Sequence, residues 1–251
     1  MELSEYAARY QSIRLNRTNG VLELTIHTRG GEALWGTTER SLHNELGHAC
    51  ADIARDPENK VILITGTGNS FIAAMDAQER APEPSMGAMW QRIYAEGMAL
   101  LENLLAIPVP VIAAVNGPAL IHAEIAVLSD IVLAAEHAVF ADLAHIPNGA
   151  VPGDGVHTVW PMLLGPNRGR YFLLTGQRIS AQEALRLGVV AEVLAADALL
   201  PRARALANQL AALPPQVLRH TRTILTRHLR RRLQDELGLG LAVEALAMLN
   251  K

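Results

Sequence analysis

The chain has 251 residues, of which 50% are hydrophobic, and this is enough to bury a large core as one α/β domain. Its net charge of −3 argues against nucleic acid or an anionic membrane surface as a partner. The single cysteine, Cys50, excludes a disulfide framework, and without a signal-peptide run or about 18 consecutive apolar residues we expect a cytoplasmic protein that does not span a membrane.

The first third of the chain predicts strands and one helix. Residues 13–16 and 21–26 alternate apolar and polar side chains around an Asn-Gly pair, which predicts a β-hairpin because Asn-Gly accepts positive φ. Thr37 or Thr38 is then expected to cap a helix whose apolar face includes Cys50 and ends at Ile53. Residues 61–65 form a continuous apolar strand, which is typical of a sheet covered by helices on both faces.

The remaining two-thirds alternate strands and helices before becoming helical. A turn-rich stretch at 82–87 is expected to be a mobile loop. Strands are predicted at 109–115, 131–134, 138–141 and 189–193, and helices at 89–105, 121–128, 156–164, 167–175 and 181–187. From residue 197 onward the pattern is helical, with a break at 213–215. This order predicts an α/β core over residues 1–195 and a helical C-terminal region over 196–251.

The only basic run lies in that helical region. Residues 227–232 carry four arginines and are followed by Asp235 and Glu236. We interpret the run as a solvated helix face rather than a phosphate-binding patch.

Three polar residues indicate hydrolytic chemistry without a serine or cysteine nucleophile. His145 and Asp154 are nine residues apart, and the proline- and glycine-rich segment between them can fold back and bring their side chains together. His122 follows the strand predicted at 109–115 and its Asn-Gly-Pro turn. Together they offer a water-activating base, an orienting carboxylate and a hydrogen-bond donor. The alternatives are two unrelated loop polar residues and a helix-capping or core histidine.

The joint order of several motifs resembles the crotonase (enoyl-CoA hydratase/isomerase) superfamily over about residues 10 to 250. The matching segments are 61–68 with 71–76 (FIAAMD), 110–120 (PVIAAVNGPAL) with 130–135 (DIVLAA), and 174–190. This resemblance implies a mixed α/β fold, a spiral of ββα units with a helical C-terminal trimerisation region.

Three departures from that pattern narrow the resemblance. Glycines that usually follow the Asn-Gly-Pro-Ala turn are replaced by Ile121-His122-Ala123 before Glu124. The second glutamate of the hydratases is replaced by His145, and their Pro-Gly-Ala-Gly turn now carries Asp154. This combination looks like the 6-oxocamphor hydrolase and β-diketone hydrolase branch. The branch implies retro-Claisen hydrolysis of a small-molecule diketone with no metal and no cofactor, in trimers or dimers of trimers.

The chemistry assigns a role to each candidate residue. Hydrolysis of a 1,3-diketone needs a base of near-neutral pKa, and His145 is expected to supply it while Asp154 accepts its N–H and fixes the tautomer. His122 is expected near a helix N-terminus, where the dipole would lower its pKa and leave a neutral donor for the second carbonyl.

Two further residues enter through the resemblance. Trp35 resembles an indole donor to the same carbonyl, and a buried core tryptophan is its alternative. Glu244 matches a C-terminal carboxylate that helps to hold the attacking water, and an exposed or inter-subunit carboxylate is the alternative. Glu124 aligns with the first glutamate of the hydratases and is ranked below the other candidates.

Three functions therefore compete. The leading one is a cofactor-independent hydrolase of cyclic or bicyclic 1,3-diketones that yields keto acids. A CoA-thioester hydratase or isomerase is the second, although the chain has only two lysines, Lys60 and Lys251. A catalytically idle scaffold is the third, and it predicts that His145, Asp154 and His122 do not converge.

Overall fold

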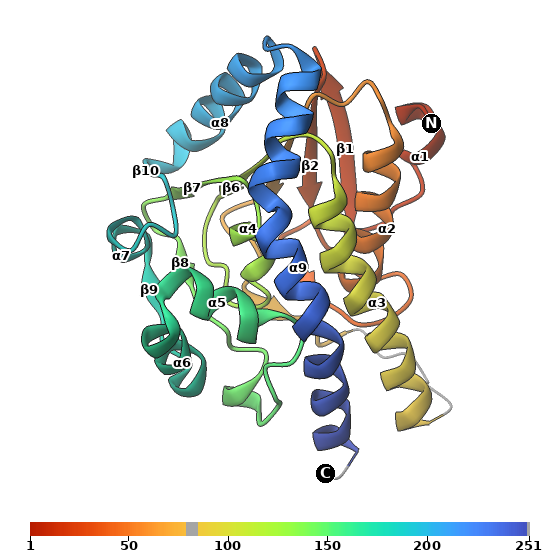
Figure 1. Cartoon of the computed structure of the whole chain (residues 1–251), viewed down its shortest axis with the longest axis vertical. Helices are drawn as coiled ribbons and strands as arrows, with labels where there is room; N and C mark the ends of the chain where they lie inside the picture. The colour runs from red at the N-terminus through yellow and green to blue at the C-terminus, as the bar shows by residue number, and fades with distance from the viewer. Residues whose placement is uncertain (79–84, 250–251) are drawn as a thin grey trace.

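A six-stranded sheet forms the centre of the molecule (Figure 1), and the computed structural model describes residues 1–78 and 85–249. The strand order is β1-β2-β4-β6-β7-β10, with β1 antiparallel to β2 and the other pairs parallel. The bounds are β1 Ile13–Thr18, β2 Val21–Ile26, β4 Val61–Gly66, β6 Val111–Val115, β7 Ile131–Ala135 and β10 Glu192–Leu194. The hairpin predicted between β1 and β2 is confirmed, since Asn19 and Gly20 turn the chain with φ of 53° and 82°.

Helices cover both faces of the sheet, as the apolar strand at 61–65 predicts. All six residues of β4 are buried, and successive side chains point to opposite faces. Ile62 and Ile64 belong to the main core cluster, whereas Val61 and Leu63 pack with Leu199 and its neighbours on α8 (Ala196–Ala211). Burial on both sides explains why this strand lacks the alternation seen in the hairpin.

Two small two-stranded sheets and several isolated bridges connect chain segments outside the main sheet. β3 (Leu34–Trp35) pairs in parallel with β5 (Ala74–Met75), and β8 (Val139–Phe140) pairs with β9 (Ile179–Ser180). Ala119 bridges to both Ile72 and Phe140. These contacts bring together chain segments that are distant in sequence.

The longest helix, α9 (Pro215–Met248), runs along the length of the molecule beside α3 (Met86–Ala106) (Figure 1). Leu233, Leu237 and Leu241 of α9 are buried in the main core. The remaining helices are short or of medium length. Their bounds are α1 Leu3–Tyr6, α2 Leu42–Arg55, α4 Glu124–Val127, η1 Ile146–Asn148 (a 3₁₀ turn), α5 Val156–Leu164, α6 Pro166–Thr175 and α7 Ala181–Arg186. Within residues 1–78 and 85–249, no helix has the length and apolar character that crossing a bilayer requires.

Helix starts account for most differences from the sequence prediction. Ser41, not Thr37 or Thr38, is the N-cap of α2. The helix expected at 121–128 is a single turn, because His122 adopts a φ of 51° that a right-handed helix excludes. α3 begins at Met86, inside the stretch predicted as a loop, and residues 82–84 of that stretch lie outside the described residues.

Strand ends differ less from the prediction. The strand expected at 189–193 lies at Glu192–Leu194, while Val189 and Val190 are buried in the core. A domain division at residue 195 stays a prediction; α8 begins at Ala196 and packs on the sheet.

Candidate active site

All five candidate residues line one cavity of about 210 Å³. β3 supplies Trp35, the turn before α4 supplies His122, and α9 supplies Glu244. His145 directly precedes η1, and Asp154 lies in the loop before α5. The apolar part of the wall comes from Met75, Trp90, Ile93, Leu241 and Met248. His145, Asp154 and His122 converge, which is the opposite of what an idle scaffold predicts.

Asp154 lies between the two site histidines. Its Oδ2 is 2.8 Å from Nδ1 of His122 and 3.3 Å from Nε2 of His145. The two imidazole rings are 5.6 Å apart and nearly perpendicular, at 84°. One carboxylate oxygen therefore bridges two imidazoles.

The contact at Nδ1 of His145 differs from the expectation. Asp142, three residues earlier, places Oδ1 2.7 Å from this nitrogen, and its side chain is almost fully buried. Asp154 lies instead at the opposite nitrogen. Sequence reasoning missed Asp142, although an aspartate three residues before a histidine was a visible signal.

The pKa of His145 is shifted far from the neutral value expected for the base. Burial lowers the pKa, but the charge of Asp154 and the hydrogen bond to Asp142 outweigh it and raise the pKa to about 12. His145 is therefore an imidazolium at neutral pH, and the expectation of a near-neutral histidine is wrong.

The pKa of His122 moves in the direction opposite to the expected one. Burial lowers it, but Asp154 and Glu124 raise the pKa to about 10. Oε1 of Glu124 lies 2.8 Å from Nδ1, and a helix of one turn has little dipole to oppose two carboxylates. His122 is therefore a cationic donor rather than a neutral one.

Glu244 is a member of this cluster whose pKa lies near neutral pH. Its Oε1 is 3.7 Å from Nε2 of His145, and the residue is buried rather than exposed. Burial and the charge of Asp154 raise the pKa of Glu244 to about 7. Burial also opposes the ionisation of Asp154, but His145 and His122 hold the pKa of Asp154 well below its usual value.

Trp35 is both buried and part of the cavity wall. Its ring stacks on His122 with centroids 4.0 Å apart and planes inclined by 31°. Its edge contacts the ring of His43 at 5.5 Å, and His43 also lines the cavity. Sequence reasoning missed His43, whose Nδ1 lies 2.9 Å from Glu96 of α3; no sequence spacing signalled this pair.

A family model described as enoyl-CoA hydratase/isomerase matches residues 16–244. The chain belongs to this family, the crotonase superfamily. A carnitinyl-CoA dehydratase from Salmonella arizonae is 35% identical over 211 residues, which cover 82% of this chain and 76% of the relative.

Solved structures give the same fold and a further likeness. A beta-diketone hydrolase from the cyanobacterium Anabaena sp., bound to (S)-3-oxocyclohexyl acetic acid, is 42% identical with a TM-score of 0.92, covering 97% of this chain and 96% of that one. An enoyl-CoA hydratase/isomerase from Mycobacterium paratuberculosis is 28% identical with a TM-score of 0.81, covering 94% and 93%. The crotonase fold expected from the sequence is thereby confirmed.

Within this crotonase fold, Glu124 does not line the cavity. It is 1% exposed, is absent from the cavity wall and contacts His122. The residue that aligns with the first hydratase glutamate therefore contacts His122, which lines the cavity, but does not line the cavity itself.

His122, Glu124 and Asp154 offer three ligand-type atoms within 4.8 Å of one another. The two contacts to Nδ1 of His122 are both 2.8 Å, which is the length of an N–H···O hydrogen bond. A proton satisfies this geometry as it stands, so we assign these atoms to hydrogen bonding.

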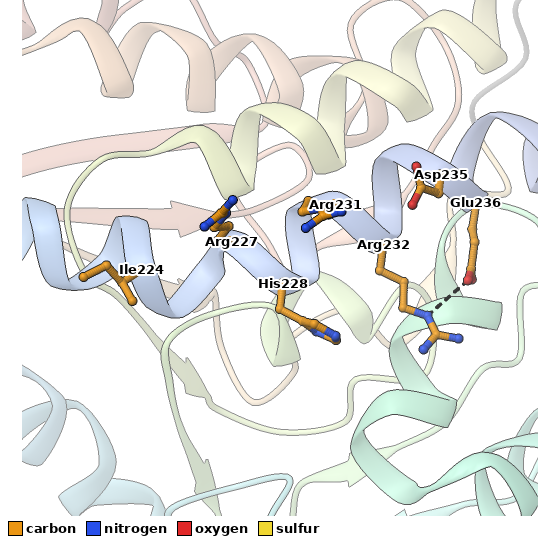
Figure 2. Close-up of a pocket in the computed structure, with 7 residues that line it drawn as sticks. All are labelled: Ile224, Arg227, His228, Arg231, Arg232, Asp235 and Glu236. Carbon is orange, nitrogen blue, oxygen red and sulfur yellow. Dashed lines mark hydrogen bonds and ion pairs between the residues drawn. The ribbon is translucent and has the colours of Figure 1, made fainter.

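A larger hollow of about 730 Å³ lies beside α9 (Figure 2). Arg227 and Arg231 project on one side of the helix, whereas His228 and Arg232 project on the other, where Arg232 pairs with Glu236 at 3.1 Å. Every residue lining this hollow comes from α9, and none belongs to the histidine cluster. The smaller cavity remains the candidate active site.

Proposed function

We propose that this crotonase-family enzyme hydrolyses the carbon–carbon bond between the two carbonyls of a cyclic or bicyclic 1,3-diketone, giving a keto acid. The observation that carries the proposal is the cluster of two imidazoles bridged by Asp154, with Glu244 beside them, in a small cavity whose remaining wall is mainly apolar. The 42% identity to a beta-diketone hydrolase supports it.

Water activation falls to Glu244 in this proposal. Its pKa of about 7 leaves a carboxylate in its basic form at neutral pH, next to the imidazolium of His145. Glu244 takes a proton from water, and the resulting hydroxide adds to one carbonyl carbon. The His145 imidazolium stabilises the negative charge that develops there. A positioned base of this kind typically contributes about 10² to 10⁴ in rate.

His122 and Trp35 stabilise the enolate that forms when the carbon–carbon bond breaks. When the carbon–carbon bond breaks, its electron pair becomes an enolate on the remaining ketone. His122, held as an imidazolium, donates a hydrogen bond to that oxygen through Nε2, and the indole N–H of Trp35 is the second donor. The proton that Glu244 took from water is delivered to the enolate carbon, and this completes the addition of one water across the broken bond.

A CoA-thioester hydratase or dehydratase is the second candidate, and the 35% identity to a carnitinyl-CoA dehydratase favours it. Against it, hydration of an alkene by two glutamates needs both in the cavity. Here one is replaced by His145 and the other, Glu124, hydrogen-bonds to His122 outside the cavity wall.

A parallel assay separates the two candidates. The protein is incubated with a symmetrical bicyclic 1,3-diketone while the ultraviolet absorbance of the enol is followed, and with crotonyl-CoA and carnitinyl-CoA. We expect diketone turnover in the wild type, a loss of about 10²-fold or more in His145→Ala, and no CoA-thioester turnover. Hydration of crotonyl-CoA or dehydration of carnitinyl-CoA, without loss of the diketone, would replace the proposal. Full activity of His145→Ala would remove His145 from it.

The proposal also covers the cofactor requirement, the oligomeric state and the cellular location of the protein. We propose that the reaction uses no metal or cofactor and that the enzyme is a cytoplasmic homotrimer or dimer of trimers. Neither nucleic acid nor membrane is a proposed partner.

A further inference from the structure

Each site histidine has a carboxylate close to it in sequence. Asp142 lies three residues before His145 and contacts its Nδ1 at 2.7 Å. Glu124 lies two residues after His122 and contacts its Nδ1 at 2.8 Å. Both carboxylates are 1% exposed, and neither lines the cavity. The same arrangement is thus built twice, from two unrelated turns.

Asp154 cannot orient both rings in the same way. Its Oδ2 meets His122 at Nδ1 but meets His145 at Nε2, the nitrogen nearest Glu244. A carboxylate that faces the reactive nitrogen competes for its proton, whereas one at the opposite nitrogen fixes the ring and the tautomer. For His145, only Asp142 occupies that second place among the described residues.

We propose that Asp142 and Glu124 are the positioning residues of this site, each holding the Nδ1–H of its own histidine so that Nε2 is left for the chemistry. Asp154 is then the shared group between the two rings rather than the orienting partner of His145. The inference deepens the proposed function and rests on it for its kinetic consequences.

The charges around each ring determine what a substitution changes. His145 faces Asp142, Asp154, Glu244 and the ring of His122. His122 faces Glu124, Asp154, the ring of His145 and Trp35, with His43 behind Trp35. Removing Asp142 leaves all contacts of His122 in place, and removing Glu124 leaves those of His145. The two substitutions should therefore act separately.

The test is a crossed pair of variants, Asp142→Asn and Glu124→Gln, in protein carrying ¹⁵N-labelled histidine. NMR titration follows the pKa and tautomer of each ring. Asp142→Asn should lower the pKa of His145 by about one unit or more and leave the pKa of His122 nearly unchanged. Glu124→Gln should lower the pKa of His122 and leave that of His145 nearly unchanged.

The two variants should also differ in their kinetics. Loss of the corresponding aspartate in serine proteases costs about 10⁴ in kcat, so we expect a fall of about 10² to 10⁴ in kcat for Asp142→Asn, with a small change in KM. For Glu124→Gln we expect kcat/KM to fall roughly tenfold, with KM raised.

Asp52→Asn is the matched control. Asp52 is also a buried carboxylate, but it bonds Arg9 and Tyr10, and none of the three lines the cavity. Asp52→Asn should change neither the pKa nor the tautomer of His145 or His122. Equal shifts of both rings in each variant, or an unshifted His145 in Asp142→Asn, would overturn the inference.

Two outcomes keep the inference separate from the proposed function and from misfolding. If the crossed NMR pattern holds but the wild type cleaves no diketone, the positioning roles stand and the proposed function fails. If a variant does not fold, the wild type still decides, because above pH 10 His122 should lose the Nε2 proton and keep the Nδ1 proton, which Glu124 and Asp154 both contact. Loss of the Nδ1 proton first would contradict the inference.

Discussion

Glu244 shows how burial can turn an ordinary carboxyl into a base suited to neutral pH. A glutamate in water has a pKa of about 4.3, so at pH 7 it is ionised and is only a weak base. In this cavity, desolvation and the neighbouring Asp154 raise the pKa to about 7, so the carboxylate regains basicity. The two imidazolium rings oppose this shift without cancelling it.

The pH dependence of turnover follows from that value. Below pH 7 Glu244 is protonated and cannot accept a proton from water, so kcat/KM should fall about tenfold per pH unit on the acid side. Glu244→Gln should lower turnover and abolish this limb. Steady-state rates between pH 5 and 9 check it; a limb that persists in Glu244→Gln would assign the titration to another group.

Single residues also mark how far the sequence alone could lead. The convergence of His145, Asp154 and His122 could be predicted, because these residues lie within motifs whose order along the chain resembles that of the crotonase superfamily. Their pKa values could not, since the values depend on which nitrogen each carboxylate meets. That depends on the φ of 51° at His122 and on the turn that places Asp142 against His145.

At the scale of elements, the loop before α5 contacts α9 through two glycines. A Cβ on Gly153 would come within 2.2 Å of the carbonyl oxygen of Gly240, and one on Gly240 would be equally close to the carbonyl oxygen of Gly153. Asp154 follows the first glycine, and Glu244 lies one helical turn beyond the second. The backbone approach therefore sets the spacing of both carboxylates.

Gly240→Ala should disturb this spacing. The added methyl group must push α9 and the loop apart, so we expect kcat to fall about tenfold or more, together with a shift of the acid limb. Gly238→Ala, two residues away on the same helix, is the control, because its Cβ would meet the flexible ends of two side chains, Tyr94 at 3.0 Å and Met98 at 4.0 Å, and no backbone atom. That variant should keep its activity and gain up to about 1 kcal/mol from helix propensity. Equal kinetics in the two variants would show that the glycine contact does not position Glu244.

Elements were predicted best where local pattern and tertiary context agree. The hairpin and the helices around α5, α6 and α7 follow their sequence signals, and Ser180 accepts a hydrogen bond from the backbone of Glu183 as a cap should. The turn before α4 does not, because His122 adopts a positive φ and its ring is held by Glu124 and Asp154. Tertiary contacts overrode propensity at the site itself.

At the scale of the whole molecule, the exposed apolar side chains of α9 bear on assembly. Ile224, Leu225 and Leu239 are 74%, 70% and 69% exposed, which is unusual for aliphatic residues on one helix. A subunit interface would remove them from water.

Light scattering after size exclusion checks this expectation. A trimer would have three times the chain mass of 27.1 kDa. Leu225→Glu, which introduces a charge on the exposed side of α9, should shift the population toward single chains while circular dichroism stays unchanged. A wild type of 27.1 kDa would remove the trimer from the proposal.

Because α9 supplies Leu241, Glu244 and Met248 to the cavity, the candidate active site is completed by a helix that follows every strand of the central sheet in the chain. Leu233, Leu237 and Leu241 of the same helix belong to the main core, so α9 joins the packing of the fold to the chemistry of the cavity. A chain shortened to residues 1–239 would keep both histidines of the cluster and lose Glu244, the proposed base.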